Sequence, residues 1–167
     1  MVPFDAEIRR ISRLVFEELY DIELIKAYKS ADTSRDTTTS PTADAHLTTT
    51  LAASSNYAFR FVLFSNNVAA VEGFQCQLDG TVGLSSMKAQ VTIFDDSTNA
   101  IAAFARITAF NSAVGAVLSL GSNHTIIEGS LESSTAGTLS LEWAQQVSGG
   151  NATTLQRGSY LVVTKLS

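Results

Sequence analysis

The stretch "LSLEWAQQVSGGNATTLQRGSYLVVTKLS", residues 139–167, decides the fold class, because it reads as two β-strands separated by a Gly-Gly-Asn turn. One face of its first half carries Leu139, Leu141, Trp143, Gln145 and Val147. One face of its second half carries Tyr160, Val162, Thr164 and Leu166. Because side chains that repeat with a period of two are typical of strands with one buried face, we expect an all-β domain.

The same period of two extends back toward Leu47. Residues 56–64, "NYAFRFVLF", and residues 74–80, "FQCQLDG", each read as one strand. Residues 87–110 and 125–147 each read as a pair of strands, around the turn sequences "DDSTN" and "SSTAG". Short strands separated by turn signals predict an antiparallel jelly-roll sandwich of about eight strands.

The alternation also selects candidate core residues. Cys76 lies between Phe74 and Leu78 on one face of its strand, so we expect a buried and unreactive thiol. Trp143 is interpreted as a core residue and not as a platform for a ligand. The residues that we expect in the core are Tyr57, Phe59, Phe61, Cys76, Leu141, Trp143 and Val162.

Composition excludes several classes of function. The chain of 167 residues has a net charge of -5, whereas nucleic-acid-binding domains carry a basic stripe. One cysteine allows no internal disulfide framework and no cysteine-based zinc site. The sequence shows neither a long apolar segment nor a secretory signal. We therefore expect no membrane or nucleic-acid partner, no cofactor or metal, and synthesis in a cytoplasm.

The first 30 residues differ from the rest of the chain in being rich in both positive and negative charge. Residues 4–20 predict a helix with Asp5 as its N-cap. This helix either packs on its own domain and sister subunits or inserts into another protein as an anchor. The candidate anchoring residues are Phe4, Ile8, Arg9, Ile11, Arg13, Val15 and Leu19. We expect three parts: this N-terminal helix with a first extended segment (1–30), a Thr/Ser-rich connection (31–46) and a jelly-roll domain (47–167).

Residues with catalytic chemistry are few, and we expect no enzymatic activity. His46 and His124 lack neighbours at metal-ligand spacing and are interpreted as surface or turn residues. Asp95 and Asp96 have the composition of a hairpin turn. Ser159 lies in "RGSYL", which is not a nucleophile elbow.

Two stretches resemble a structural module of tailed bacteriophages. They are "KSADTSRDTTTSPTADAHLTTTLAASSNYAFRFVLF" (29–64) and the end of the chain, with "GTLSLEWAQ" and "TTLQRGSYLVVTKL". The matching positions include Lys29, Asp32, Thr33, Ser34, Asp44, Leu47, Leu51, Ala52, Ala53, Tyr57, Phe59, Ile127, Gly129 and Leu131. The resemblance implies a jelly roll similar to the tumour necrosis factor and C1q heads, usually assembled as a trimer.

Modules of this kind serve as capsid decoration proteins, head fibres or spikes, or parts of tail and neck fibres. We therefore expect a homotrimeric protein on the virion surface, attached to the phage capsid or another virion protein through residues 1–30. The alternative is the receptor- or glycan-binding head of a tail or neck fibre. The expected loops contain almost no aromatic residues, which weighs against a glycan site.

Overall fold

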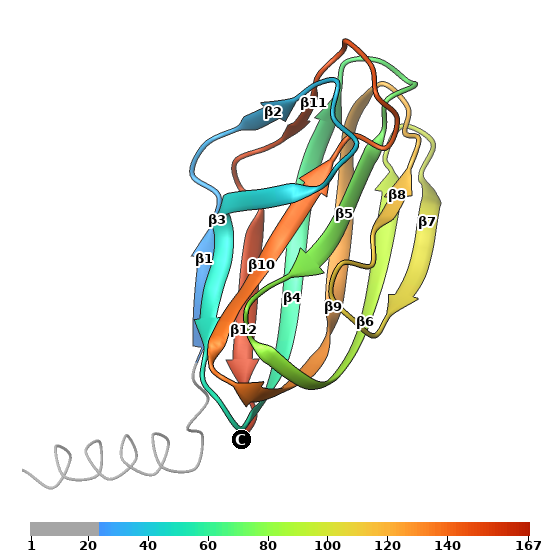
Figure 1. The fold of residues 1–167 in the computed structure, drawn as a ribbon. Helices are drawn as coiled ribbons and strands as arrows, with labels where there is room; N and C mark the ends of the chain where they lie inside the picture. Colours follow the sequence, from blue (N-terminus) through green and yellow to red (C-terminus); the bar gives the residue numbers. More distant parts are fainter. Residues whose placement is uncertain (1–23) are drawn as a thin grey trace, which may run out of the picture.

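A computed structural model describes residues 24–167 as two antiparallel β-sheets packed face to face (Figure 1). The strands are β1 (Leu24–Tyr28), β2 (Thr33–Arg35), β3 (Thr42–Leu51), β4 (Ser55–Asn67), β5 (Phe74–Asp79), β6 (Gly83–Asp95), β7 (Ala100–Ile107), β8 (Val114–Ala116), β9 (Gly121–Thr135), β10 (Gly137–Ala144), β11 (Thr153–Leu155) and β12 (Tyr160–Lys165). The predicted all-β antiparallel sandwich is confirmed. No helix in this described part of the chain is long and apolar enough to cross a lipid bilayer.

The order of strands in the two sheets resembles the winding of a jelly roll. The larger sheet runs β1-β12-β4-β9-β6-β7, and the smaller sheet runs β3-β10-β5-β8. When β2, β6, β7 and β11 are left out, eight strands remain in two four-stranded sheets, β1-β12-β4-β9 and β3-β10-β5-β8. The chain crosses from one sheet to the other several times, as in the double Greek key of a jelly roll. The β6–β7 hairpin widens the larger sheet by two strands, and β11 joins β2 to the end of β4.

The pairing of strands differs from the sequence expectation in two places. The two strands of residues 139–167 do not pair, because β10 lies in the smaller sheet between β3 and β5, whereas β12 lies in the larger sheet between β1 and β4. The strands around "SSTAG", β9 and β10, also lie in different sheets. A turn sequence marks a reversal of the chain, and it does not identify the partner of either strand.

The boundary expected at residue 47 is wrong. The connection expected over residues 31–46 contains β2 and the first half of β3, and β1 pairs with β12 along its whole length. Thr-rich segments read as loops by composition, yet Thr is also a good strand residue once a neighbouring strand supplies hydrogen bonds. The sandwich therefore begins by residue 24. The predicted helix over residues 4–20 and its anchoring residues lie outside the described residues.

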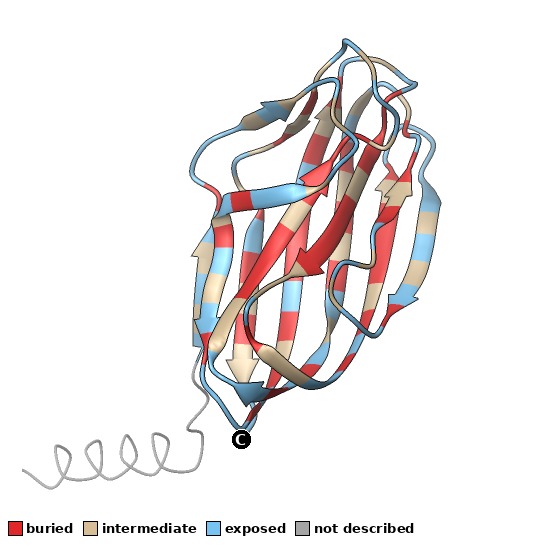
Figure 2. Ribbon diagram, viewed as in Figure 1, coloured by how far each residue is buried: buried red, intermediate tan, exposed pale blue. Residues whose placement is uncertain are grey.

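The core lies between the two sheets, where buried residues alternate with exposed ones along most strands (Figure 2). Six of the seven residues expected in the core are buried: Tyr57, Phe59, Phe61, Cys76, Leu141 and Trp143. Trp143 is fully buried and stacks on Phe74, with 5.9 Å between the ring centroids.

The placement of Val162 in the core is wrong. Its neighbours Leu161 and Val163 are fully buried, and Val162 points to the outer face, opposite Arg60. Because Leu161, Val162 and Val163 are all apolar, the sequence does not show which of them point into the core. A shift of the assignment by one residue exchanges the buried and the exposed face of the strand. Val147 also lies outside the core, beyond the end of β10 and 45% exposed.

Candidate functional site

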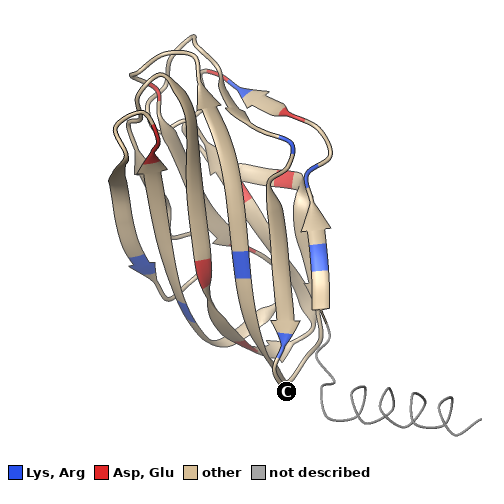
Figure 3. Ribbon diagram, turned by 180° about the vertical axis from the view of Figure 1, so that it is seen from behind, with Lys and Arg blue, Asp and Glu red and all other residues tan. Residues whose placement is uncertain are grey.

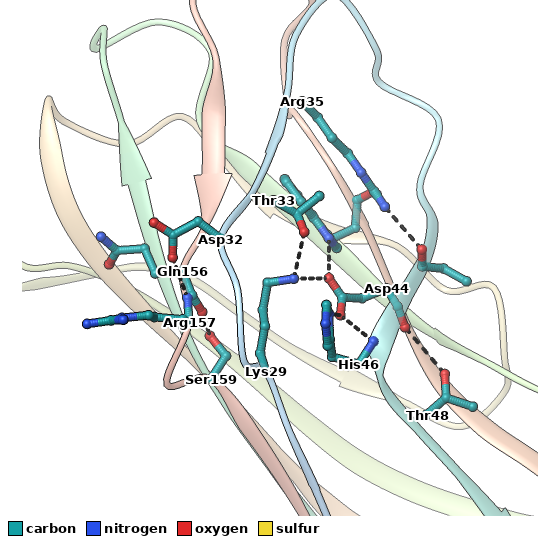
Figure 4. Close-up of polar contacts among 12 residues, drawn as sticks. Lys29, Asp32, Thr33, Arg35, Asp44, His46, Thr48, Gln156, Arg157 and Ser159 are labelled. Carbon is teal, nitrogen blue, oxygen red and sulfur yellow. Dashed lines mark hydrogen bonds and ion pairs between the residues drawn. The ribbon is translucent and has the colours of Figure 1, made fainter.

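A buried ion pair joins the first and third strands of the sandwich (Figure 4). Lys29 follows β1, Asp44 lies in β3, and the Lys29 Nζ is 2.6 Å from the Asp44 Oδ2 with both side chains at most 1% exposed. Lys29 also donates a hydrogen bond to the Thr33 Oγ1 at 2.8 Å. A buried charge is costly unless it is paired and hydrogen-bonded, and this lysine has both kinds of partner.

Both carboxylate oxygens of Asp44 accept hydrogen bonds. Its Oδ1 accepts the backbone N–H of His46 at 3.0 Å, and its Oδ2 accepts the Trp143 Nε1–H at 3.3 Å. Burial by itself raises the pKa of Asp44, but the hydrogen bonds from Lys29, His46 and Trp143 outweigh it and hold this pKa below its usual value. Asp44 is therefore a carboxylate that acts as a structural acceptor.

Arg35 lies next to this cluster and covers the ring of Trp143. Its guanidinium lies 4.1 Å from the centroid of the Trp143 ring, a cation–π contact, and it donates hydrogen bonds to the carbonyls of Thr42, Ala43 and Trp143. Burial lowers the pKa of Arg35, while the charges of Asp44 and Glu142 oppose this effect.

We call Lys29, Thr33, Arg35, Asp44 and Trp143 the clasp. It connects β1 and β2 of the larger sheet with β3 and β10 of the smaller one. The sequence resemblance includes Lys29, Thr33 and Asp44 as separate positions, and the structure places both Thr33 and Asp44 in direct contact with Lys29. Every charged group of the clasp already has partners, so its chemistry is that of a structural lock and not of a catalytic site.

The other candidate residues from the sequence are also structural. Asp95 accepts hydrogen bonds from Ser97, Thr98 and Ser119, and the hydroxyl hydrogen bonds of Ser119 and Ser97 hold its pKa well below the usual value. Burial raises the pKa of the Cys76 thiol to about 12. Among residues 24–167, no group of three or more His, Cys, Asp or Glu side chains lies together.

A surface of a different kind covers the outer side of the larger sheet. One row of side chains crosses all six strands, with each member directly opposite the next: Tyr28, Tyr160, Val62, Ile126, Thr92 and Phe104. A second row beside it is Phe64, His124, Phe94 and Ile101. We call these ten residues the aromatic face. Figure 3 shows this side of the sheet with long uncharged stretches.

Several side chains of the aromatic face are open to solvent. Tyr28 is 61% exposed, Ile101 is 59% exposed and Phe104 is 54% exposed. His124 stacks on Phe94, with 4.3 Å between the ring centroids, and its Nδ1 is 2.6 Å from Asp96. None of these residues was expected at an interaction surface, although aromatic side chains at the outward positions of strands, such as Phe64 in "AFRFVLF", were a visible signal.

The outer side of the smaller sheet has the opposite character. Its outward residues are Ala43, Thr48, Thr50, Gln75, Gln77, Asp79, Gly115, Thr138, Ser140, Glu142 and Ala144. None of them is aromatic or a large aliphatic residue, as expected for a surface that faces water. The two outer faces therefore differ in role, and the aromatic face is the candidate interaction surface, since contiguous exposed apolar patches mark contact sites.

Strand β7 adds an open edge to this surface. Among the strands of residues 24–167 it pairs only with β6, and seven of its eight residues are exposed or half-buried. Its sequence, "AIAAFARI", carries no charge before Arg106. An apolar edge strand of this kind readily contacts another chain unless the protein covers it.

A polar row borders the aromatic face on one side. It consists of Lys26, Val162, Arg60, Glu128, Gln90 and Arg106, again in direct register across the sheet. Arg60 and Glu128 form an exposed ion pair at 3.7 Å. Where β7 leaves β6, a pocket of about 570 Å³ opens among Lys88, Gln90, Arg106 and Glu128.

One comparison with solved structures supports the fold. No protein-family description matches this sequence, and no curated protein matches it significantly. Among solved structures, Eiger, a TNF from S. frugiperda, is similar over 87% of this chain and 93% of that chain, with a TM-score of 0.50 and 8% sequence identity. This similarity supports the jelly-roll resemblance, and at such low identity it concerns the fold alone.

Two other similar structures are more distant. The CBM22-1 and GH10 modules of xylanase 10B from Clostridium thermocellum match 88% of this chain and 25% of that chain, with a TM-score of 0.34 and 13% identity. The infectious bursal disease virus Gx strain structure matches 86% of this chain and 39% of that chain, with a TM-score of 0.25 and 11% identity. These TM-scores are too low for any argument about function.

Proposed function

We propose that this protein is a non-enzymatic structural protein on the virion surface of a tailed phage, a homotrimeric capsid decoration or head-fibre protein. The sequence resemblance to phage structural modules supports the setting, and the antiparallel sandwich is the architecture that this resemblance implies. The observation that carries the proposal is the aromatic face, which places exposed aromatic and aliphatic side chains on the outer side of one sheet.

A second copy of the chain is the occupant that fits this face. Among residues 24–167, the exposed large apolar side chains that lie on strands are all on the larger sheet: Leu24, Tyr28, Phe64, Ile101, Phe104 and Tyr160. A contact between the face of one copy and the β7 edge of the next uses both surfaces at once. Such a heterologous contact closes into a ring when the rotation between copies allows it, and three copies give a trimer.

The dimensions of the surface suit a specific contact. Six strands at about 4.8 Å spacing make the sheet about 24 Å wide, and three rows of side chains cover about 20 Å along the strands. The flat projection is therefore about 500 Å² per copy, and two copies bury on the order of 1,000 Å², within the lower range of specific interfaces. The polar row contains both Glu128 and three basic residues, so it offers charges of both signs at the rim of the contact.

Attachment to the capsid, or to another virion protein, is assigned in this proposal to residues 1–30. The sandwich begins by residue 24, and its last strand, β12, is held between β1 and β4. The candidate anchoring side chains are those named from the sequence, with Ile8, Ile11 and Val15 on one stripe of the expected helix.

Oligomeric state provides the first test. Native mass spectrometry and sedimentation of the full chain are expected to give a trimer. The double variant I101K/F104K is expected to give monomers, whereas the matched variant T48K/T50K on the outer side of the smaller sheet leaves the trimer intact. A monomeric wild-type protein at tens of micromolar would overturn the proposed assembly.

Location on the particle provides the second test. Antibodies against the full chain, used to label intact phage particles in electron microscopy, are expected to decorate the head. The variant I8D/I11D of the full chain is expected to lose binding to capsids that lack this protein, while it remains a trimer. Labelling confined to the tail, or unchanged binding of the variant, would contradict the capsid attachment.

A further inference from the structure

A group of buried polar side chains lies at the end of the sandwich where β4 ends and β5 begins. Asn67 is 1% exposed, Glu72 is 2% exposed and Gln145 is fully buried. Several polar atoms of these three side chains have no hydrogen-bond partner among the described residues: Asn67 Oδ1 and Nδ2, Glu72 Oε2 and Gln145 Oε1. Buried polar atoms without partners are rare in folded proteins and call for a physical explanation.

Hydrogen bonds connect three of these residues around Asn151. The Asn151 Nδ2 donates to the Glu72 Oε1 at 2.9 Å, and the Gln145 Nε2 donates to the carbonyl oxygen of Asn151 at 2.6 Å. Asn67 reaches the same region through Thr153, which is its partner in the β4–β11 pairing. The Thr153 hydroxyl donates to the carbonyl of Gly73, directly after Glu72, at 2.9 Å. Glu72, Gln145 and Asn151 are thus joined by hydrogen bonds, and Asn67 lies beside them through its pairing with Thr153.

The charge of Glu72 is not balanced by the described part of the chain. The ion pairs formed by residues 24–167 involve Asp44, Asp96 and Glu128, and Glu72 is in none of them. A buried carboxylate without a cationic partner is costly, and proteins usually pair such a group or use it to coordinate a metal ion. The backbone of Gly149 also packs against this carboxylate, since an added Cβ there lies 2.3 Å from Glu72 Oε1.

We propose that this cluster binds a calcium ion through the Glu72 Oε2, the Asn67 Oδ1 and the Gln145 Oε1, with water and backbone carbonyls completing the coordination. Calcium prefers oxygen ligands and accepts carboxylates, amides and carbonyls together in flexible geometries. The amide nitrogen of Gln145 is already used toward Asn151, which leaves its oxygen for a cation. A single carboxylate predicts weak binding, with a Kd of about 1 mM, as in extracellular modules. This site does not depend on the proposed oligomer.

Terbium luminescence tests the site directly, because Tb³⁺ takes the same oxygen ligands as calcium. Trp143, the single tryptophan, lies two residues before Gln145 and stacks on Phe74, so it can transfer excitation to an ion in the cluster. We expect Tb³⁺ emission on tryptophan excitation in the full chain, competed by CaCl2. The variant E72Q removes the charge and keeps the shape, and it is expected to lose the emission. The matched variant D79N, at the far end of β5, is expected to retain it.

Thermal unfolding gives an independent measure. With a Kd of about 1 mM, 10 mM CaCl2 is expected to raise the Tm by about 3–6 °C relative to NaCl of equal ionic strength. The variant N67D supplies a second carboxylate and is expected to show a larger calcium-dependent rise, which a purely structural asparagine would not produce. Emission that is absent from the wild type, or equal in E72Q, overturns the proposal, and the cluster then holds ordered water only.

Discussion

Removing one member of the Lys29–Asp44 pair should be more damaging than removing both. In D44N the Lys29 ammonium stays buried with the Thr33 hydroxyl and a neutral amide as its partners. In K29M the Asp44 carboxylate stays buried, although it keeps the donors from His46 and Trp143. In the double variant K29M/D44N no buried charge remains in the pair.

The magnitudes follow from the burial of both side chains. Breaking a buried ion pair by removing one partner costs about 3–5 kcal/mol, because the other charge is left uncompensated. The double variant leaves only a poorly matched amide near the Trp143 Nε1–H, a defect of about 1–3 kcal/mol. The coupling energy between Lys29 and Asp44 is therefore expected to be at least about 3 kcal/mol. Either single variant is therefore expected to remove a large part of the free energy of unfolding, which is typically about 5–15 kcal/mol for a protein.

Urea unfolding at a fixed protein concentration provides the assay, with Trp143 fluorescence and circular dichroism as two probes. The control is E128Q, which breaks the exposed Arg60–Glu128 pair at 3.7 Å and should change the free energy of unfolding by less than about 1 kcal/mol. Additive single variants, or a D44N protein as stable as E128Q, would refute the assignment of the clasp as a structural lock.

Three further predictions concern other parts of the sandwich. Acidification should reduce the difference in unfolding free energy between the wild type and D44N. Because the pKa of Asp44 is lowered in the folded state, its carboxylate stabilises the protein fully above about pH 5, and this stabilisation is lost as the pH falls through the native pKa. Urea unfolding midpoints measured from pH 7 to pH 3 test this. Cys76 should not react with a thiol reagent until the protein unfolds, because burial raises its pKa to about 12; rapid labelling of native protein would contradict this. G129A should lower the Tm by about 3–10 °C, because the added Cβ lies 2.3 Å from the Lys88 carbonyl oxygen, while G150A, with no atom within 4 Å, serves as the unaffected control.

The aromatic face illustrates what a sequence pattern leaves undecided. Alternation in "AFRFVLF" identifies a strand, and it places Phe59 and Phe61 on one side. The side chain of Phe64 points to the other side, and only the packing of the two sheets determines which side is covered. The same reasoning explains Val162, where both phases of the strand are apolar.

The clasp is a stronger example, because its members come from distant positions. Lys29, Asp44 and Trp143 are visible in the sequence as parts of separate patterns. Their contact depends on β10 lying beside β3 and on the path of the chain after β1, both of which are long-range features. Local turn signals carry no information on such pairings.

The sequence by itself determined the class of structure: strands with a period of two, separated by turn residues, on a chain without catalytic or metal-binding motifs. It determined this because side-chain alternation and turn chemistry are local properties of the backbone. The tertiary structure decided that residues 139–167 supply one strand to each sheet, that Glu72 and Asn67 are buried, and that Tyr28, Ile101 and Phe104 are exposed on one side of the larger sheet. These features depend on which strands pair and on which face of each strand is buried. Both are decided by the packing of the two sheets against each other, which involves residues far apart in the sequence.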